Sequence, residues 1–202
     1  MIRKFPLIPT LVVAAAVAAM IALGFWQLRR AAEKDALLAR YQAAQNLPPI
    51  SFPTGPIHDD QLPLFRHAAG LCLKPVTKRT SNGRNRAGEI GYVLIVDCLT
   101  GAEGPGMSVE LGWTRNPNAP VNWRGGPVSG IIAPDRKSRM RLVAATAPPG
   151  LAPSAPPSID QIPNNHRSYA VQWFLFALIA AVIYILAVRK RLNDQGQQGQ
   201  RA

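Results

Sequence analysis

Two long apolar runs near the ends of the chain enclose a middle part in which short apolar stretches alternate with polar and proline-rich ones. Residues 5–28 contain no charged side chain, and neither do residues 168–188. About 20 helical residues, at about 1.5 Å each, cross a hydrocarbon core of about 30 Å. The pattern therefore predicts two transmembrane helices, at residues 9–28 and 168–188.

The first run also resembles a secretory signal peptide, because Arg3 and Lys4 form a positive segment before it. However, it exceeds the usual apolar length of about 7–15 residues. It also ends in the bulky Phe25 and Trp26 rather than in a small-residue cleavage site. These features favour an uncleaved anchor.

Cations flank both runs on the outer sides of the chain, at Arg3, Lys4, Arg189, Lys190 and Arg191. The positive-inside rule then predicts cytoplasmic termini, at residues 1–8 and 189–202. In such a hairpin the aromatic residues Trp26, Tyr169 and Trp173 share the outer interface. We therefore expect a plasma (inner) membrane protein with two spans and an extracytoplasmic part at residues 29–167.

The extracytoplasmic part begins with strong helix formers, so the first helix is expected to continue through residues 31–41 and to stop at Pro48 and Pro49. Short segments rich in Val, Ile and Leu then predict five strands, at residues 65–73, 90–98, 107–113, 128–133 and 139–144. The predicted class is an α+β membrane protein, with two transmembrane helices bracketing a β-rich extracytoplasmic domain.

Two segments of this domain are predicted to lack regular structure. Residues 74–89 are polar and basic and are interpreted as a hairpin loop. Residues 147–163 contain prolines at 148, 149, 153, 156, 157 and 163, a density that no regular element tolerates. We expect this second segment to be a semi-extended strap that returns the chain to the membrane.

The net charge of +12 raises the question of nucleic acid binding. Residues 29–167 hold 17 Lys or Arg against 10 Asp or Glu, an excess of +7 that is dispersed. A translocated domain does not meet nucleic acid, so no nucleic acid partner is expected. Membrane lipids of negative charge, an acidic face of a membrane partner, and a solvated surface with no partner all fit.

Cys72 and Cys98 are the two cysteines, on separate predicted strands. Two interpretations fit: a disulfide outside the cytoplasm, or two buried free thiols. No CxxC, CxxCH, GxSxG, HExxH or P-loop motif is present, so neither covalent haem, thiolate copper nor hydrolase chemistry is indicated. We expect the protein not to be an enzyme.

His166 lies just before the second apolar run, at the expected outer interface. Helical spacing places it on one face with Tyr169, Ala170 and Trp173, a setting that suits the axial face of a lipophilic haem. The alternative is an interfacial histidine that caps the helix or contacts lipid headgroups. Gln27 and Gln172 each lie near the outer membrane end of their span, and they could hydrogen-bond across the hairpin or to a partner helix.

Several short motifs follow one another along the chain. Residues 23–30 (LGFWQLRR), with Lys34 behind them, and residues 164–174 (NNHRSYAVQWF) mark the two spans. Gly91-Tyr92-Val93, Glu110-Leu111-Gly112-Trp113 and Val128-Ser129-Gly130 follow one another between the spans. Over essentially its whole length the chain resembles the surfeit-locus (Surf-one, or Shy-one) cytochrome oxidase assembly proteins, with Leu111 at the arginine of their Asn-Arg-Gly-Trp motif.

This resemblance implies a chaperone of respiratory-chain biogenesis that helps to insert haem a into the catalytic subunit of a haem-copper cytochrome c oxidase. The implied partners are that subunit, the haem a synthesis machinery and membrane lipids. His166 would be the haem ligand, the only metal contact expected, with Tyr169, Gln172 and Trp173 around it. The residues expected to contact a partner or to pack are Trp26, Gln27, Gly112 and Trp113.

Two alternatives to haem insertion are retained. The same hairpin and domain could stabilise an oxidase intermediate as a scaffold that does not bind haem. The chain could also be a membrane-anchored module that binds an envelope component and has no link to respiration.

Overall fold

The computed structural model describes residues 6–101 and 105–198. Arg3 and Lys4, from which a cytoplasmic N-terminus is predicted, lie outside the described residues. The chain forms two compact units. One contains the residues up to Leu37 and from Pro163 onward, and the other runs from Leu38 to Ile162. The first is helical and the second contains a seven-stranded sheet, which confirms the α+β prediction.

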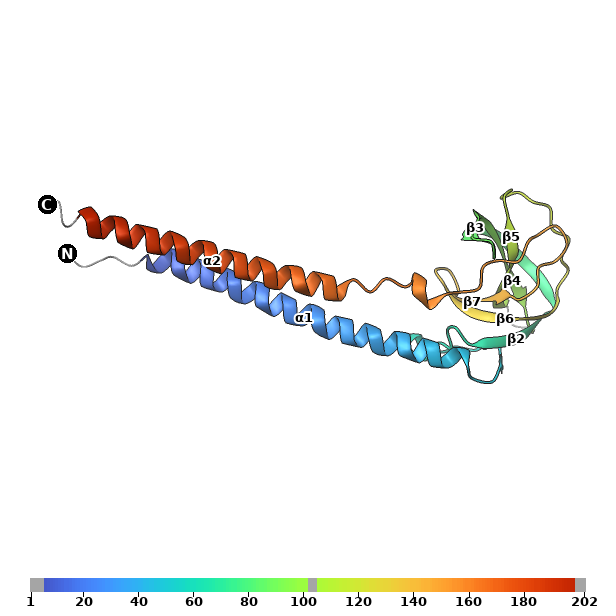
Figure 1. The fold of residues 1–202 in the computed structure, drawn as a ribbon. Helices are drawn as coiled ribbons and strands as arrows, with labels where there is room; N and C mark the ends of the chain where they lie inside the picture. The colour runs from blue at the N-terminus through green and yellow to red at the C-terminus, as the bar shows by residue number, and fades with distance from the viewer. Residues whose placement is uncertain (1–5, 102–104, 199–202) are drawn as a thin grey trace. The chain divides into compact units, whose positions relative to one another are not determined.

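Two long helices make up most of the first unit. Helix α1 is Leu7–Gln45 and helix α2 is His166–Gln198 (Figure 1). They are antiparallel, because Thr10 near the start of α1 bonds to Tyr184 far along α2, while Gln27 bonds to His166 at the start of α2. Both are long and apolar enough to cross a membrane. The predicted continuation of α1 beyond residue 30 is confirmed, and the helix ends before Pro48.

The sheet of the second unit has the strand order β1-β2-β6-β7-β5-β4-β3. The pairs β1–β2 and β5–β7 are parallel and the other neighbours are antiparallel. The five predicted strands are confirmed as β2, β4, β5, β6 and β7. The strands are β1 Ile50–Ser51, β2 His67–Cys72, β3 Lys74–Arg84, β4 Ile90–Leu99, β5 Pro105–Thr114, β6 Gly126–Asp135 and β7 Arg139–Ala144.

Strand β3 corrects the prediction of a loop over residues 74–89. Its residues Lys74–Arg84 pair with β4 along their whole length, and only the residues after Arg84 form the turn. As the last strand in the sheet order, β3 is exposed over most of its length, so it lacks the alternating apolar pattern by which a strand is recognised.

The strap over residues 147–163 is irregular for most of its length, as predicted. Two features depart from that prediction: a 3-10 helix, Ile159–Gln161, and single bridges that pair Ala152 with Trp113 and Ser154 with Asn85. A proline lacks the N–H donor but keeps its carbonyl, so the intervening residues can still make short pairings.

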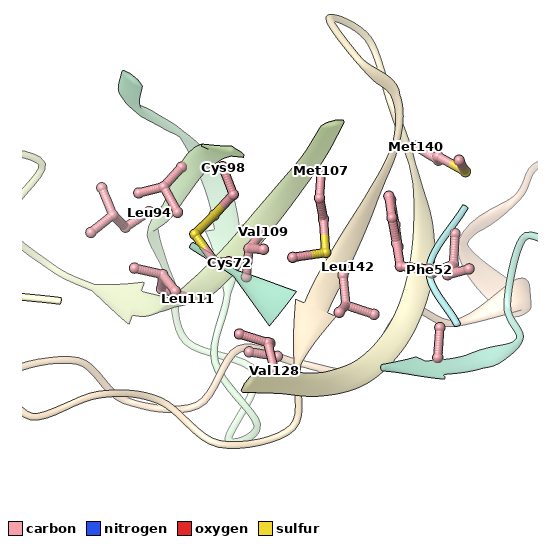
Figure 2. Packing of buried hydrophobic residues seen from close by; sticks show 14 of the residues in the cluster. Phe52, Cys72, Leu94, Cys98, Met107, Val109, Leu111, Val128, Met140 and Leu142 are labelled. Atoms are coloured by element: carbon pink, nitrogen blue, oxygen red, sulfur yellow. A yellow bond between two sulfur atoms is a disulfide. The ribbon is translucent and has the colours of Figure 1, made fainter. Parts of the chain in front are cut away.

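The sheet curls on itself around the core. Only Leu73 separates β2 from β3, yet β2 pairs with β6 and β3 pairs with β4 at the far end of the sheet order. One continuous segment therefore serves two distant positions in the sheet. Figure 2 shows the core that this curl encloses, with the disulfide between Cys72 and Cys98 among residues such as Leu94, Val109 and Leu142. Of the two interpretations of Cys72 and Cys98, a disulfide or two free thiols, the structure contains the disulfide.

Candidate functional site

The candidate site is the pair formed by His166 and Gln27, where α2 begins beside α1. The ring nitrogen Nδ1 of His166 lies 2.8 Å from the side-chain oxygen Oε1 of Gln27. Gln27 thus bonds across the helix pair, and its partner is His166. The side chain of Gln172 is exposed on α2. In the structure the Nδ1 atom of His166 therefore contacts a side chain of α1 and, among the described residues, makes no capping bond to the backbone of α2.

Small residues allow the two helices to approach at this point. Gly24 and Ala31 are the buried residues of α1, and they flank Gln27 by one helical turn on either side. On α2, Ala170 is 1% exposed and lies one turn after His166. A Cβ atom on Gly24 would lie 2.6 Å from the Phe174 ring, so only glycine fits here without a shift of that ring.

The aromatic residues predicted around His166 do not all lie in the seam between the helices. Trp173 is partly buried and meets Phe176 edge to face, with ring centroids 6.3 Å apart. Tyr169 is 49% exposed. Of the predicted face, His166 and Ala170 therefore line the seam, and the Tyr169 ring is open to the surroundings.

Trp26 was predicted to contact a partner or to pack. It is 49% exposed, and the guanidinium carbon of Arg30 lies 5.8 Å from the centroid of its ring. This is cation–π geometry and places a positive charge beside the Trp26 ring.

A second contact between the helices flanks His166, and sequence reasoning missed it. The carboxylate of Asp35 on α1 accepts hydrogen bonds from Asn164 Nδ2 at 2.8 Å and from an Arg167 guanidinium nitrogen at 2.6 Å. These bonds hold the chain on both sides of His166. The sequence offers two acids on α1, Glu33 and Asp35, and a base beside His166, and nothing pairs Asp35 with that base until the antiparallel alignment is known.

Gly112 and Trp113 are packing residues that hold the strap. The Trp113 N–H donates to the Ala152 carbonyl at 2.7 Å, and the Ala152 N–H donates to the Trp113 carbonyl at 2.9 Å. A Cβ on Gly112 would lie 2.7 Å from that Ala152 carbonyl. A Cβ on Gly91 would lie 2.6 Å from the Trp113 ring, so the Gly-Tyr and Gly-Trp motifs meet on adjacent strands.

Ion pairs occupy the sheet face opposite the main core. Glu110 is 3% exposed and accepts a hydrogen bond from Arg141 Nε at 2.7 Å. Asp135 pairs with Arg79 at 2.7 Å and with Arg141 at 3.2 Å. A cavity of about 550 Å³ lies between this face and the strap. Of its charged lining residues, Glu110 and Arg141 are paired with each other, and Arg84 donates a hydrogen bond to the Gly88 carbonyl. We assign this network to folding.

Hydrogen bonds and neighbouring positive charges favour the ionised form of two carboxyl groups in the sheet, Asp135 and Asp97. Burial raises the pKa of Asp135, but the backbone N–H of Ser138 and the guanidinium groups of Arg79 and Arg141 lower it by more, so the net pKa is below the usual range. For Asp97, burial again raises the pKa, and hydrogen bonds from Ser108 and Thr77 with the charge of Lys137 outweigh it. Both carboxylates therefore favour the folded state when ionised.

Comparison with known proteins assigns a family. A family model described as the SURF1 family matches residues 14–178. A SURF1-like protein of Rickettsia felis is 26% identical over 216 residues, covering 86% of this chain and 94% of that protein. A SURF1-like protein of Monosiga brevicollis is 23% identical over 222 residues, covering 86% and 85%. A SURF1-like protein of Rickettsia conorii is 26% identical over 213 residues, covering 85% and 87%.

Proposed function

Because this chain belongs to the SURF1 family, which is linked to cytochrome oxidase assembly, we propose that it is a non-catalytic membrane factor that assists haem a insertion into the catalytic subunit of a haem-copper oxidase. The haem a synthesis machinery would supply the cofactor and the oxidase subunit would receive it. The observation that carries the haem part is the position of His166 at the start of α2, with one ring nitrogen bonded to Gln27.

The exposed apolar surface of the helices supports membrane insertion. Large side chains point outward along both helices, which is stable in hydrocarbon and costly in water. Within the helix pair, the Thr10 and Tyr184 hydroxyl groups are hydrogen-bonded at 2.5 Å, and the Thr10 hydroxyl also contacts the Pro6 carbonyl at 2.6 Å. The exposed residues include Leu7, Ile8, Leu11, Val12, Phe25, Leu175, Phe176, Leu178, Ile179, Ile183 and Leu186.

The disulfide between Cys72 and Cys98 supports an extracytoplasmic domain, because disulfides persist in oxidising compartments. With Arg189, Lys190 and Arg191 on the cytoplasmic side, both termini would be cytoplasmic. Thiol trapping in intact cells tests this topology. We expect both cysteines to be protected from alkylation until a reductant is added, and free thiols in growing cells would contradict the topology.

The donor chemistry of the site fits a haem. A neutral imidazole is an axial ligand of haem iron, and bonding of Nδ1 to Gln27 leaves Nε2 of His166 for that role. The Tyr169 ring is exposed and the Trp173 ring is partly buried, so both are available for flat apolar contacts. Haem a, when bound, supplies the iron and the macrocycle that the oxidase uses for electron transfer. The chain's own part is to bind and orient that group and then to release it.

A single protein ligand suits transfer, because a factor that delivers a group must also release it. The retained alternative is a scaffold that stabilises the oxidase subunit without touching haem. A scaffold has no use for the imidazole of His166, so a substitution that removes only this ring distinguishes the two functions.

The test is a strain that lacks the gene. We expect lower cytochrome c oxidase activity and a weaker haem a band in the reduced-minus-oxidised spectrum of its membranes, both restored by the wild-type chain. His166→Ala should not restore them, whereas His67→Ala, at an exposed position of β2, should. Full restoration by His166→Ala would favour the scaffold, and an unchanged spectrum and activity in the deletion strain would reject the oxidase function.

A further inference from the structure

One polar contact joins the His166 ring to the other helix. Gln27 and His166 are 139 positions apart in the sequence, and their side chains meet at 2.8 Å in a partly buried seam. The ring atom in this contact is Nδ1, and the amide atom is the oxygen Oε1. The identity of these two atoms decides what the other ring nitrogen can do.

An amide oxygen accepts hydrogen bonds and does not donate them. The contact therefore places a proton on Nδ1 of His166. A neutral imidazole carries one ring proton, so Nε2 is then unprotonated and keeps its lone pair. Metal-bound histidines are commonly held in this way, with the second ring nitrogen donating to a protein acceptor that sets the tautomer and the ring orientation.

The surroundings of Gln27 keep its side chain in place. Gly24 and Ala31 are buried one turn before and one turn after it, so the backbones of α1 and α2 approach closely at this level. Replacement of the bond by water is hindered in such a seam, and an unpaired buried polar group is costly. The bond is therefore the stable arrangement of both side chains.

The residues that flank His166 are bonded to α1 independently of its ring. Asp35 binds Asn164 and Arg167, on either side of His166, at 2.8 and 2.6 Å. Asp35 contacts the side chains of these flanking residues and not the ring, so the ring of His166 can still rotate and exchange its proton. Gln27 restricts both.

We propose that Gln27 is a positioning residue that holds the His166 imidazole with its proton on Nδ1 and presents Nε2 as a neutral ligand to haem iron. The proposal rests on the proposed haem function. Gln27 itself does not touch the iron; it acts through His166.

The first test measures the tautomer in the full chain in detergent without haem. Nitrogen chemical shifts of ¹⁵N-labelled histidine are recorded at about pH 8, above the ordinary titration range of histidine. His166→Ala assigns the signal among the three histidines. We expect wild type and Gln27→Glu to carry the proton on Nδ1, and Gln27→Leu and Gln27→Ala to show mixed tautomers. Gln42→Leu, an exposed glutamine of the same helix, is the matched control and should match wild type.

The second test titrates the same proteins with ferric protoporphyrin IX and follows the Soret band. Gln27→Leu is expected to raise the Kd about 10- to 100-fold, as loss of an outer-sphere partner does at metal sites. Gln27→Glu, which keeps an acceptor, and Gln42→Leu should bind like wild type. Circular dichroism establishes that each variant retains its helices, and Gln27→Ala replaces Gln27→Leu if the latter does not fold.

The two tests separate this proposal from the haem function. A proton on Nε2 in the wild type, or equal tautomer populations in wild type and Gln27→Leu, would overturn positioning by Gln27. Porphyrin binding that His166→Ala does not weaken would overturn the haem function. In that case the tautomer populations alone would still uphold or reject the part assigned to Gln27.

Discussion

Cys72 at the end of β2 and Cys98 in β4 are joined across the core, with their Cα atoms 5.2 Å apart, although three strands lie between β2 and β4 in the sheet order. The bond is possible because the chain turns directly from β2 into β3, which pairs with β4. Cys72 therefore lies at the corner where the curled sheet meets itself. The disulfide closes this corner and is buried with the core side chains around it.

Replacing both cysteines by alanine should lower the free energy of unfolding by about 3 kcal/mol, because the bond closes a long loop and so restricts the unfolded chain. Urea unfolding of the full chain in detergent, followed by tryptophan fluorescence, measures the change. A reductant should destabilise the wild type and leave the double variant unaffected. Equal unfolding midpoints for wild type and variant would show that the bond does not contribute.

Gly112→Ala should loosen the strap. The added Cβ would lie 2.7 Å from the Ala152 carbonyl, a backbone atom that moves only if the strap moves. Crowding of this kind costs about 1–3 kcal/mol. Limited proteolysis should cut residues 145–158 faster in the variant, as seen by mass spectrometry. Gly55→Ala, where nothing lies within 4 Å of the new atom, is the control and should be cut like wild type.

Gly24→Leu should force the two helices apart, since even a Cβ at this position lies 2.6 Å from the Phe174 ring. Because this contact is beside Gln27, the variant should also weaken the bond to His166. We expect mixed His166 tautomers in nitrogen NMR and a loss of about 1–3 kcal/mol of stability in detergent.

Truncation of Phe174 tests whether crowding against its ring causes the loss of stability in Gly24→Leu. Phe174→Ala in combination with Gly24→Leu should recover part of the lost stability, a coupling that a double-mutant cycle measures. Additive effects of the two substitutions would contradict the proposed contact.

Acid should destabilise the sheet domain through Asp135. Its folded-state pKa is lowered, so its contribution to stability is complete above the unfolded pKa of about 3.9 and is lost as the pH falls through the folded value. Asp135→Asn should therefore lower the melting temperature at pH 7, and the difference from wild type should shrink as the pH falls below about 4. Asp60→Asn, on the surface loop at the 3-10 helix Asp59–Gln61, should leave the melting temperature unchanged at each pH. A constant difference across this range would reject the ionic contribution of Asp135.

Much of the fold follows from local patterns in the sequence. The apolar runs predict α1 and α2 because an uncharged apolar segment of about 20 residues is by itself long enough to indicate a membrane-spanning helix. The prolines at 48 and 49 predict where α1 stops. The strands β4, β5, β6 and β7 are predicted because each carries buried apolar residues in a short segment bounded by turn residues. Strand β3 is missed because an edge strand rich in Lys, Arg and Thr carries no such pattern.

The candidate site divides in the same way. The sequence indicates His166 and Gln27 separately, each as a polar residue at the end of an apolar helix. Their contact, the Asp35 clamp on Asn164 and Arg167, and the anchoring of the strap by Trp113 depend on which distant segments lie side by side.

By itself, the sequence determined the two apolar helices, most of the strands and the family motifs. The helices follow from the length of their uncharged apolar runs, and the strands follow from short apolar segments bounded by turn residues. The tertiary structure alone decided three relationships: the curl that joins Cys72 to Cys98, the edge position of β3, and the pairing of Gln27 with His166. These join residues far apart along the chain, and their contacts arise from the antiparallel alignment of two helices and the closure of one sheet. No local periodicity encodes either of these.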